Sequence, residues 1–252
     1  MKLLGIVVLC LIAIPARAAD ISVLCAGAAR GSIVPLIDPF QRESGHVIRF
    51  DYGTAGQILE KLKAGMKEGT RPDVVIVTPA VIAELEKAGI VAAGASVALA
   101  KTGVGVGVRE GAPRPDISSV ESFRATLLAA RAVAYIDPAA GGTSGRHFAG
   151  VLARLGIETE IKAKAVLVPG GYAAEHVAKG EADLVVHQIS EILPVKGVTL
   201  VGPLPAELQL YTTYAATIVA GTPQAEAARA WIAYLAGPAG RCAFAERGLE
   251  AL

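Results

Sequence analysis

The sequence predicts an α/β fold in which parallel strands alternate with helices that cover both faces of a sheet. Short runs of β-branched residues alternate with segments whose apolar residues recur at helical spacing. The run DVVIV at 73–77 is almost wholly apolar, which is typical of a strand buried on both faces. The composition, with 53% hydrophobic residues, also suffices for a large core.

The first part of the chain carries three strand and helix pairs. The expected strands cover 21–25, 47–51 and 73–77, and the first two helices cover 32–43 and 57–63. A third helix is expected to start at Thr78-Pro79, because threonine suits the N-cap and proline the first helical position. Gly89 is expected to end it.

A second set of elements begins near Lys101. The Gly-Val run at 104–108 predicts a central strand that other backbone approaches closely. Ser118 is expected to cap a helix that ends near Ala130, with Glu121 completing the cap. Further strands are expected at 132–136, 165–168, 184–187 and 211–219, and further helices at 144–155, 173–179, 223–236 and 238–246.

Two such sets followed by a return segment predict two lobes between which the chain crosses twice. The expected crossings lie at 100–103 and 202–209, where Pro203 and Pro205 interrupt the pattern. In α/β lobes, ligands bind outside the carboxyl ends of strands, where loops lead into helices. The loops at these junctions are therefore the candidates for a binding site.

The N-terminus predicts export. Lys2 precedes an apolar run over 3–14, and Ala16-Arg17-Ala18 has the small-x-small form of a signal-peptidase site. Twelve apolar residues are too few for a bilayer core of about 30 Å, which needs roughly 20 in a helix. We therefore expect residues 1–18 to be a cleaved signal peptide and the mature protein to lie in the periplasm.

Charge and motif content disfavour several functions. Without residues 1–18 the chain has 22 basic and 23 acidic side chains, so no basic face for nucleic acid is expected. Four histidines without paired spacing give no metal signature, no cofactor motif occurs, and there is no G-x-S-x-G elbow. We expect a binding protein rather than an enzyme, with Cys25 and Cys242 as separate buried thiols rather than a disulfide.

Four strand-to-helix junctions are rich in glycine and other small residues. They cover 26–29, 53–56, 141–145 and 169–172. Small residues ahead of a helix expose the N–H groups of its first turn, which suit an anion, although glycine there also simply makes tight turns. Thr54 and Ser144 carry hydroxyls that either donate to a ligand or only cap their helices. Gln188, at the carboxyl end of a strand, is expected to line the cleft.

Other side chains near these loops have two interpretations each. Arg30, Arg146 and His147 are candidate anion partners or ordinary solvent-facing residues of a first helical turn. Tyr172 either closes over a ligand or packs within its loop.

Six segments together carry a family resemblance that spans essentially the whole chain after residue 18. They are VLCAGAA, DYGTAGQILEKLKAG, RPDVVIVTP, AYIDPAAGGTSGRHFAGVLARLGI, VLVPGGYAAEHVAKGEADLVVHQIS and AARAWIAYLAGPAGRCAFAERGL. In this order they resemble the molybdate-binding proteins of ABC importers and, more closely, the divergent extracellular solute-binding proteins related to them. The resemblance implies a type II periplasmic-binding-protein fold, with lobe 1 at 19–101 plus 205–252 and lobe 2 at 102–204, closing by hinge motion.

The resemblance also implies a ligand set and partners. The implied ligand-binding residues are Ala28, Thr54, Ala55, Gly145, Gly170, Gly171 and Gln188, and the hydroxyl of Ser144 in the third loop completes the predicted set. Ala28 stands where a hydroxyl residue is expected and Gln188 where a tyrosine is expected. Each lost hydrogen bond to a charged ligand costs roughly 1.5–3 kcal/mol. The ligand is therefore either a molybdate-like or tungstate-like oxyanion or a small organic carboxylate. The protein is expected to be a monomer that delivers its ligand to an importer permease or, alternatively, acts as a ligand sensor for a signalling receptor.

Overall fold

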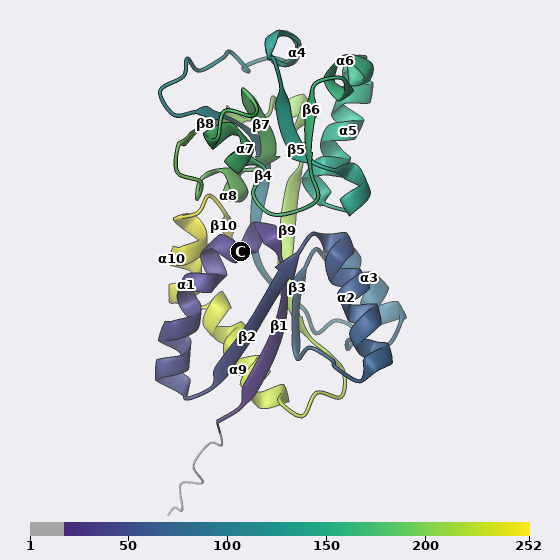
Figure 1. The fold of residues 1–252 in the computed structure, drawn as a ribbon. Helices are drawn as coiled ribbons and strands as arrows, with labels where there is room; N and C mark the ends of the chain where they lie inside the picture. The colour runs from purple at the N-terminus through teal and green to yellow at the C-terminus, as the bar shows by residue number, and fades with distance from the viewer. Residues whose placement is uncertain (1–17) are drawn as a thin grey trace, which may run out of the picture.

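The computed structural model describes residues 18–252, so nearly all of the expected signal peptide lies outside the described residues. Figure 1 shows two α/β lobes, one above the other, joined by long strands. The strands are β1 (Asp20–Ala26), β2 (Val47–Gly53), β3 (Val74–Val77), β4 (Val97–Arg109), β5 (Val133–Ile136), β6 (Ala165–Val168), β7 (Leu184–Gln188), β8 (Val198–Pro203), β9 (Tyr211–Ile218) and β10 (Glu250–Ala251). The helices are α1 (Gly27–Ser44), α2 (Ala55–Glu68), α3 (Pro79–Lys87), α4 (Val120–Ala129), α5 (Thr143–Leu155), α6 (Glu158–Lys162), α7 (Ala174–Ala178), α8 (Ile189–Ile192), α9 (Ala225–Ala236) and α10 (Pro238–Ala245), with short 3-10 helices at Pro138–Ala140 and Ala206–Leu208.

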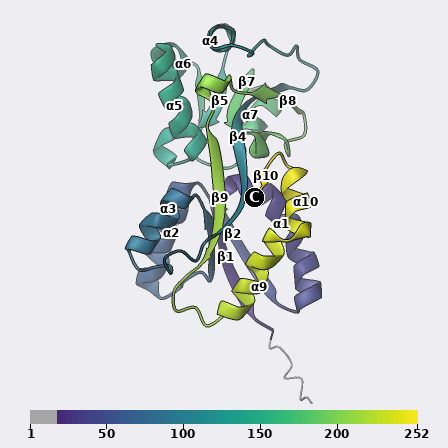
Figure 2. The same ribbon diagram turned by 180° about the vertical axis from the view of Figure 1, so that it is seen from behind.

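The strands follow the order β2-β1-β3-β9-β4-β7-β5-β6, with β8 and β10 also paired to β4. The pairs of β1 with β2 and β3, and of β5 with β6 and β7, are parallel, which confirms the predicted α/β class. The first part of β4 pairs with β9, and its second part pairs with β7 and β8. The strand β4 therefore belongs to both lobes, and Figure 2 shows it rising beside β9 through the middle of the molecule.

Helices cover both faces of the sheet in each lobe. In lobe 1, α1, α9 and α10 lie on one face and α2 and α3 on the other (Figures 1 and 2). The apolar clusters change lobe between Ala100 and Val104, and again between Leu208 and Tyr214. These points lie close to the expected crossings, but Leu208 packs in the core of lobe 2. The lobe boundaries themselves stay a prediction.

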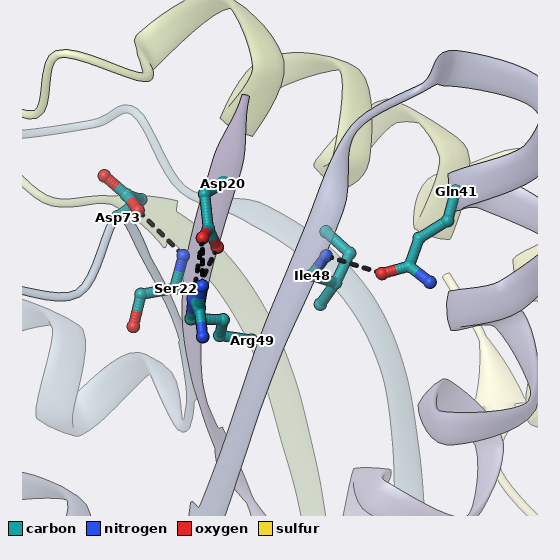
Figure 3. Close-up of polar contacts among 6 residues, drawn as sticks. All are labelled: Asp20, Ser22, Gln41, Ile48, Arg49 and Asp73. Carbon is teal, nitrogen blue, oxygen red and sulfur yellow. Dashed lines mark hydrogen bonds and ion pairs between the residues drawn. The ribbon is translucent and has the colours of Figure 1, made fainter. Parts of the chain in front are cut away.

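Polar contacts fix the strands of lobe 1 at the end where β1, β2 and β3 begin. The Asp73 carboxylate, which is buried, accepts a hydrogen bond from the Ser22 backbone N–H at 2.7 Å (Figure 3). Arg49 pairs with Asp20 through a forked contact between β2 and β1. Gln41 of α1 accepts a hydrogen bond through Oε1 from the Ile48 N–H of β2 at 2.8 Å, which ties α1 to the sheet edge.

The glycines of β4 confirm the prediction that other backbone approaches this strand. A Cβ on Gly105 would lie 2.9 Å from the Gly202 carbonyl oxygen and 2.7 Å from Ile189. A Cβ on Gly107 would meet side chains of β7, α8 and β8 at 3.0 Å or less. The two glycines therefore let β8 and α8 lie directly against β4.

Several expected elements differ from the structure. Helix α1 starts at Gly27 rather than at 32, because β1 runs straight into it through an extended Ala26. The cap of α4 is Ser119 with Ser122, not Ser118 with Glu121. Thr78 is the N-cap of α3, but its side chain makes no capping hydrogen bond. The strand β8 and the short helices α6 and α8 were not predicted.

The two thiols are separate, as expected, but only Cys25 is buried and Cys242 is exposed. Within residues 18–252, no helix combines the length and apolar character that a membrane crossing requires.

Candidate functional site

A small cavity lies between the lobes, at the carboxyl ends of β1, β2, β5 and β7. It is lined by Ala26, Gly27, Ala28, Tyr52, Gly53, Thr54, Ala55, Ile136, Gly142, Thr143, Ser144, Gly171, His187, Gln188, Glu191 and Tyr214, and we call it the interlobe cavity. About 40 Å³ is open to the centres of water molecules. The cavity lies where α/β folds place ligands, outside the carboxyl ends of strands.

Two helices from opposite lobes begin at this cavity without a side-chain cap. The N-cap residues of α1 and α5 are Ala26 and Gly142, which have no side-chain acceptor for the first-turn N–H groups. Both helices are long enough, at 18 and 13 residues, for their dipoles to add positive potential there. The cavity is therefore suited to an anion held by backbone amides from both sides.

The third helix at the cavity, α2, has a complete capping box. Its capping residues Thr54 and Gln57 also hydrogen-bond the other lobe, and we call these two contacts the clasp. Thr54 Oγ1 accepts from the Gln57 N–H at 3.2 Å and donates to the Ala140 carbonyl at 2.5 Å. Gln57 Oε1 accepts from the Thr54 N–H at 2.9 Å, while its Nε2 donates to the Pro169 carbonyl at 3.1 Å. The Thr54 hydroxyl therefore lines the cavity, but it donates its hydrogen bond to lobe 2. The structure confirms Thr54 as a capping residue, and contact of its hydroxyl with a ligand, which capping does not exclude, stays a prediction.

Gln188 is buried, lines the cavity and has one unsatisfied side-chain atom. Its Nε2 donates to Thr212 Oγ1 at 3.0 Å and lies 3.5 Å from the Tyr214 hydroxyl, whereas its Oε1 has no partner among residues 18–252. Both hydroxyls can donate as well as accept. The amide can therefore turn by half a rotation without losing these bonds, and it would then offer an N–H donor to an anion.

Two residues that the sequence did not predict, Glu191 and His187, bring a carboxyl group and an imidazole to this site. Glu191 Oε2 lies 3.2 Å from His187 Nδ1, and both side chains are buried. His187 Nδ1 accepts from the Gln188 N–H at 2.7 Å, and Nε2 lies 3.3 Å from the Gly171 carbonyl, which fits a neutral ring protonated at Nε2. The signal was the stretch HQISE, which places a glutamate four residues beyond a histidine at a strand end.

Burial sets the charge of this pair. Desolvation raises the pKa of Glu191 from 4.5 to about 8. It lowers the pKa of His187 to about 4, although the hydrogen bond to the Gly171 carbonyl acts in the opposite direction. Near pH 7 most molecules therefore hold a neutral carboxylic acid beside a neutral imidazole.

The cationic candidates do not line the cavity. The Arg30 guanidinium stacks 3.7 Å from the centre of the Tyr52 ring and 5.6 Å from that of Tyr172, so it joins two aromatic residues at the rim. His147 Nε2 lies 2.7 Å from the Leu208 carbonyl. Neither His147 nor Arg146 lines the cavity.

Six of the eight predicted site residues line the interlobe cavity: Ala28, Thr54, Ala55, Ser144, Gly171 and Gln188. The other two, Gly145 and Gly170, do not. A Cβ on Gly145 would lie 2.2 Å from the Ile136 carbonyl oxygen, so this glycine is needed where α5 packs on β5. Gly170, at φ +159°, lies beside Gln57 in the clasp between the lobes. Ligand contact by any of the eight stays a prediction.

The fold is that of a solute-binding protein. Residues 21–250 match the family described as bacterial extracellular solute-binding protein, and the chain belongs to this family. The fold is the type II periplasmic-binding-protein fold, as predicted. The periplasmic molybdate-binding protein of Azotobacter vinelandii has a TM-score of 0.69 at 19% identity, with 91% of this chain and 98% of that one covered.

Two further similar proteins are known by what they bind or act on. The sulfate-binding protein SubI from Mycobacterium tuberculosis has a TM-score of 0.71 at 18% identity, covering 93% of this chain and 87% of that one. A Pseudomonas protein named aconitate isomerase is 31% identical over 233 residues, which is 91% of this chain and 87% of the relative. The family and its structural neighbours are binding proteins, whereas this relative carries the name of an enzyme. Within residues 18–252, no group of three or more histidine, cysteine or acidic side chains is arranged to hold a metal ion.

Proposed function

We propose that this protein is exported to the periplasm, binds a small organic anion in the interlobe cavity and delivers it to the permease of an ABC importer. The observation that carries this proposal is the pair of uncapped helix N-termini, α1 and α5, that reach one cavity from opposite lobes. The ligand joins the lobes through these amides and so selects the closed state. Export follows from the signal-peptide pattern over residues 1–18.

A carboxylate is favoured over an oxyanion such as molybdate for two reasons. The first is that two hydroxyl donors expected for an oxyanion are lost, because Ala28 has no hydroxyl and Thr54 donates to lobe 2. The second is the acid Glu191 in the cavity. Its protonated carboxyl can donate a hydrogen bond to a ligand carboxylate, whereas binding a doubly charged oxyanion does not require such an acid. The 31% identity to a protein named after a tricarboxylate supports the same choice, whereas the oxyanion-binding neighbours share below 20%.

The size of the cavity requires the lobes to move. A space of about 40 Å³ holds only a few water molecules. An organic acid therefore needs the lobes to open by the hinge before it enters and to close around it afterwards. The strands β4 and β9, which pass between the lobes, provide that hinge.

A thermal-shift screen tests the proposal. The panel contains mono-, di- and tricarboxylates, with molybdate, tungstate, sulfate and phosphate. A ligand at 100 times its Kd stabilises the folded state by about 2.7 kcal/mol and raises the Tm of a chain of this size by on the order of 5–10 °C. We expect a carboxylate to produce this shift. Stabilisation by molybdate and tungstate alone would contradict the proposal.

A matched pair of variants tests whether the ligand binds in the interlobe cavity. Thr143 lies in the first turn of α5 and lines the cavity, so Thr143→Asp adds a charge that suits the helix but repels an anion. Thr159→Asp makes the same change in the first turn of α6, at an exposed position away from the cavity. We expect T143D to lose the ligand-induced shift and T159D to keep it. Equal shifts in the two variants would place the ligand elsewhere.

A further inference from the structure

Glu191 lies at the point of the interlobe cavity where the anion is proposed to bind. Its Oε1 is 3.0 Å from the position that a Cβ on Gly27 would occupy, so the carboxyl stands over the first residue of α1. Its Oε2 faces His187 Nδ1 at 3.2 Å. A ligand carboxylate held by the amides of α1 therefore lies next to a side chain that can carry a proton.

The surroundings of Glu191 leave its carboxyl without a compensating cation. The titratable groups that face it are His187 on β7, Cys25 on β1, Tyr214 on β9 and Tyr172 in the loop before α7. Arg30 on α1 stacks on the aromatic rings of Tyr52 and Tyr172 rather than on the acid. Arg247, next to Gly248 in the loop packed on α8, acts on the Tyr172 phenol, and the pKa of Glu191 is raised by burial with no cation lowering it. Among the other elements packed on α8, β8 has no titratable side chain, and Lys101 of β4 pairs with Glu250. The carboxylate form of Glu191 is accordingly a much stronger base than a solvated glutamate, because burial raises its pKa to about 8.

The other groups of the cavity are poorer proton carriers. Both ring nitrogens of His187 face backbone partners, and burial lowers its pKa to about 4, so the ring is a weak base. Burial raises the pKa of Tyr214 well above 10, which makes its phenolate inaccessible near neutral pH. Glu191 is left as the group that can both take and return a proton.

Resting on the proposed carboxylate site, we propose that Glu191 is a catalytic acid–base residue that isomerises a bound unsaturated polycarboxylate by moving a proton between two of its carbons. The substrate class contains the unit CH₂–C(COO⁻)=CH, with carboxylates on the outer carbons. The relative named aconitate isomerase is consistent with this class. The activity goes beyond the capture and delivery of a ligand.

The step is balanced without a cofactor or a co-reactant. The Glu191 carboxylate removes a proton from the CH₂ carbon, and the electron pair of that C–H bond becomes a new C=C bond to the central carbon. The Glu191 carboxyl then returns the same proton, or one exchanged with solvent, to the far carbon. There the electrons of the old C=C bond form the new C–H bond. Negative charge that develops between the two transfers spreads onto the carboxylates, which the amides of α1 and α5 stabilise.

The experiment follows aconitate by proton NMR in D₂O with the full chain after residue 18. We expect wild-type protein to interconvert the cis and trans isomers and to exchange their carbon-bound hydrogens with deuterium. The variant E191Q copies the shape of the protonated acid but cannot carry a proton. We expect it to bind aconitate within a few-fold of wild type by calorimetry and to lose about 10²–10⁴ in the exchange rate.

Two further measurements separate a catalytic role from a structural one. The exchange rate of wild type at limiting substrate is expected to rise with pH and to level off above about 8, because the base must be ionised. The control E175Q, at an exposed position of α7, is expected to keep the wild-type rate.

Each contrary outcome is distinct. Exchange by E191Q at the wild-type rate overturns the role of Glu191. Binding of aconitate and related acids by wild type without any exchange overturns the isomerase activity and leaves the proposed binding function standing. A wild-type protein that binds no carboxylate overturns both proposals.

Discussion

The clasp between the lobes offers a test in which the stability of the fold and the affinity for ligand change separately. Gln57 uses one amide atom in each lobe: Oε1 accepts from the Thr54 N–H within lobe 1, and Nε2 donates to the Pro169 carbonyl of lobe 2. The substitution Gln57→Glu keeps the acceptor and removes the donor. It also places a carboxylate oxygen opposite the Pro169 carbonyl, 3.1 Å away in the present geometry.

The expected magnitudes follow from these two contacts. A capping box accepts glutamate as well as glutamine, and a negative charge at the start of α2 favours the helix. The free energy of unfolding without ligand is therefore expected to stay within about 0.5 kcal/mol or to rise slightly. The closed state loses a hydrogen bond worth about 1 kcal/mol, which raises the Kd for ligand about fivefold.

Calorimetry gives the Kd, with the ligand that the thermal screen identifies, and thermal unfolding without ligand gives the stability. The matched control is Gln41→Glu, which also keeps its acceptor role toward the Ile48 N–H but lies in lobe 1, away from the clasp. We expect Q41E to keep the wild-type Kd. The reasoning is refuted if Q57E binds as tightly as wild type, or if its affinity falls only in proportion to a general loss of stability.

Three further substitutions test packing, hydrogen bonding and charge. Gly145→Ala places a Cβ 2.2 Å from the Ile136 carbonyl oxygen, so α5 must shift, and urea unfolding is expected to show a loss of about 1–3 kcal/mol. Asp73→Ala leaves the half-buried Ser22 N–H without its carboxylate, and we expect a loss of about 1.5–3 kcal/mol by the same measurement. Burial raises the pKa of Glu191 to about 8, so above pH 4.5 the unfolded state releases this proton first and the native state loses stability as pH rises to about 8. Glu191→Gln removes that dependence, and its stability relative to wild type is expected to grow by up to about 1.4 kcal/mol per pH unit between pH 4.5 and 8; a constant difference would contradict the assignment.

The parts of the fold that sequence predicts well are those fixed by local patterns. The strand β3 is an unbroken apolar run, and it lies at the centre of lobe 1 as expected of a strand buried on both faces. The loops after β1, β2 and β5 meet at one cavity because the carboxyl ends of these strands do. Ser118 and Ser119 could not be told apart as caps, since serine three residues before an acceptor occurs in both registers.

The parts that sequence cannot predict depend on contacts between distant residues. The Thr54 hydroxyl donates a hydrogen bond to a carbonyl oxygen 86 positions away in the sequence, and no local pattern indicates that partner. Gly145 is glycine because of the Ile136 carbonyl, a contact that α5 makes only when it is packed on β5. Glu191 follows a strand in a four-residue helix, where an acidic residue ordinarily faces water, and only the packing of α8 against α1 and β4 buries it.

The burial that favours anion binding in the proposed site is also what raises the basicity of its carboxylate. Excluding water strengthens the attraction between an anion and the amides of α1 and α5. The same exclusion destabilises the ionised form of Glu191, and so raises the basicity of the carboxylate when it does form. A lobed protein that closes on a carboxylate thus holds its ligand beside a strong base with little water to compete for the proton. A single acidic side chain, placed where a binding protein needs only neutral donors, is enough in this arrangement to connect ligand capture with proton transfer.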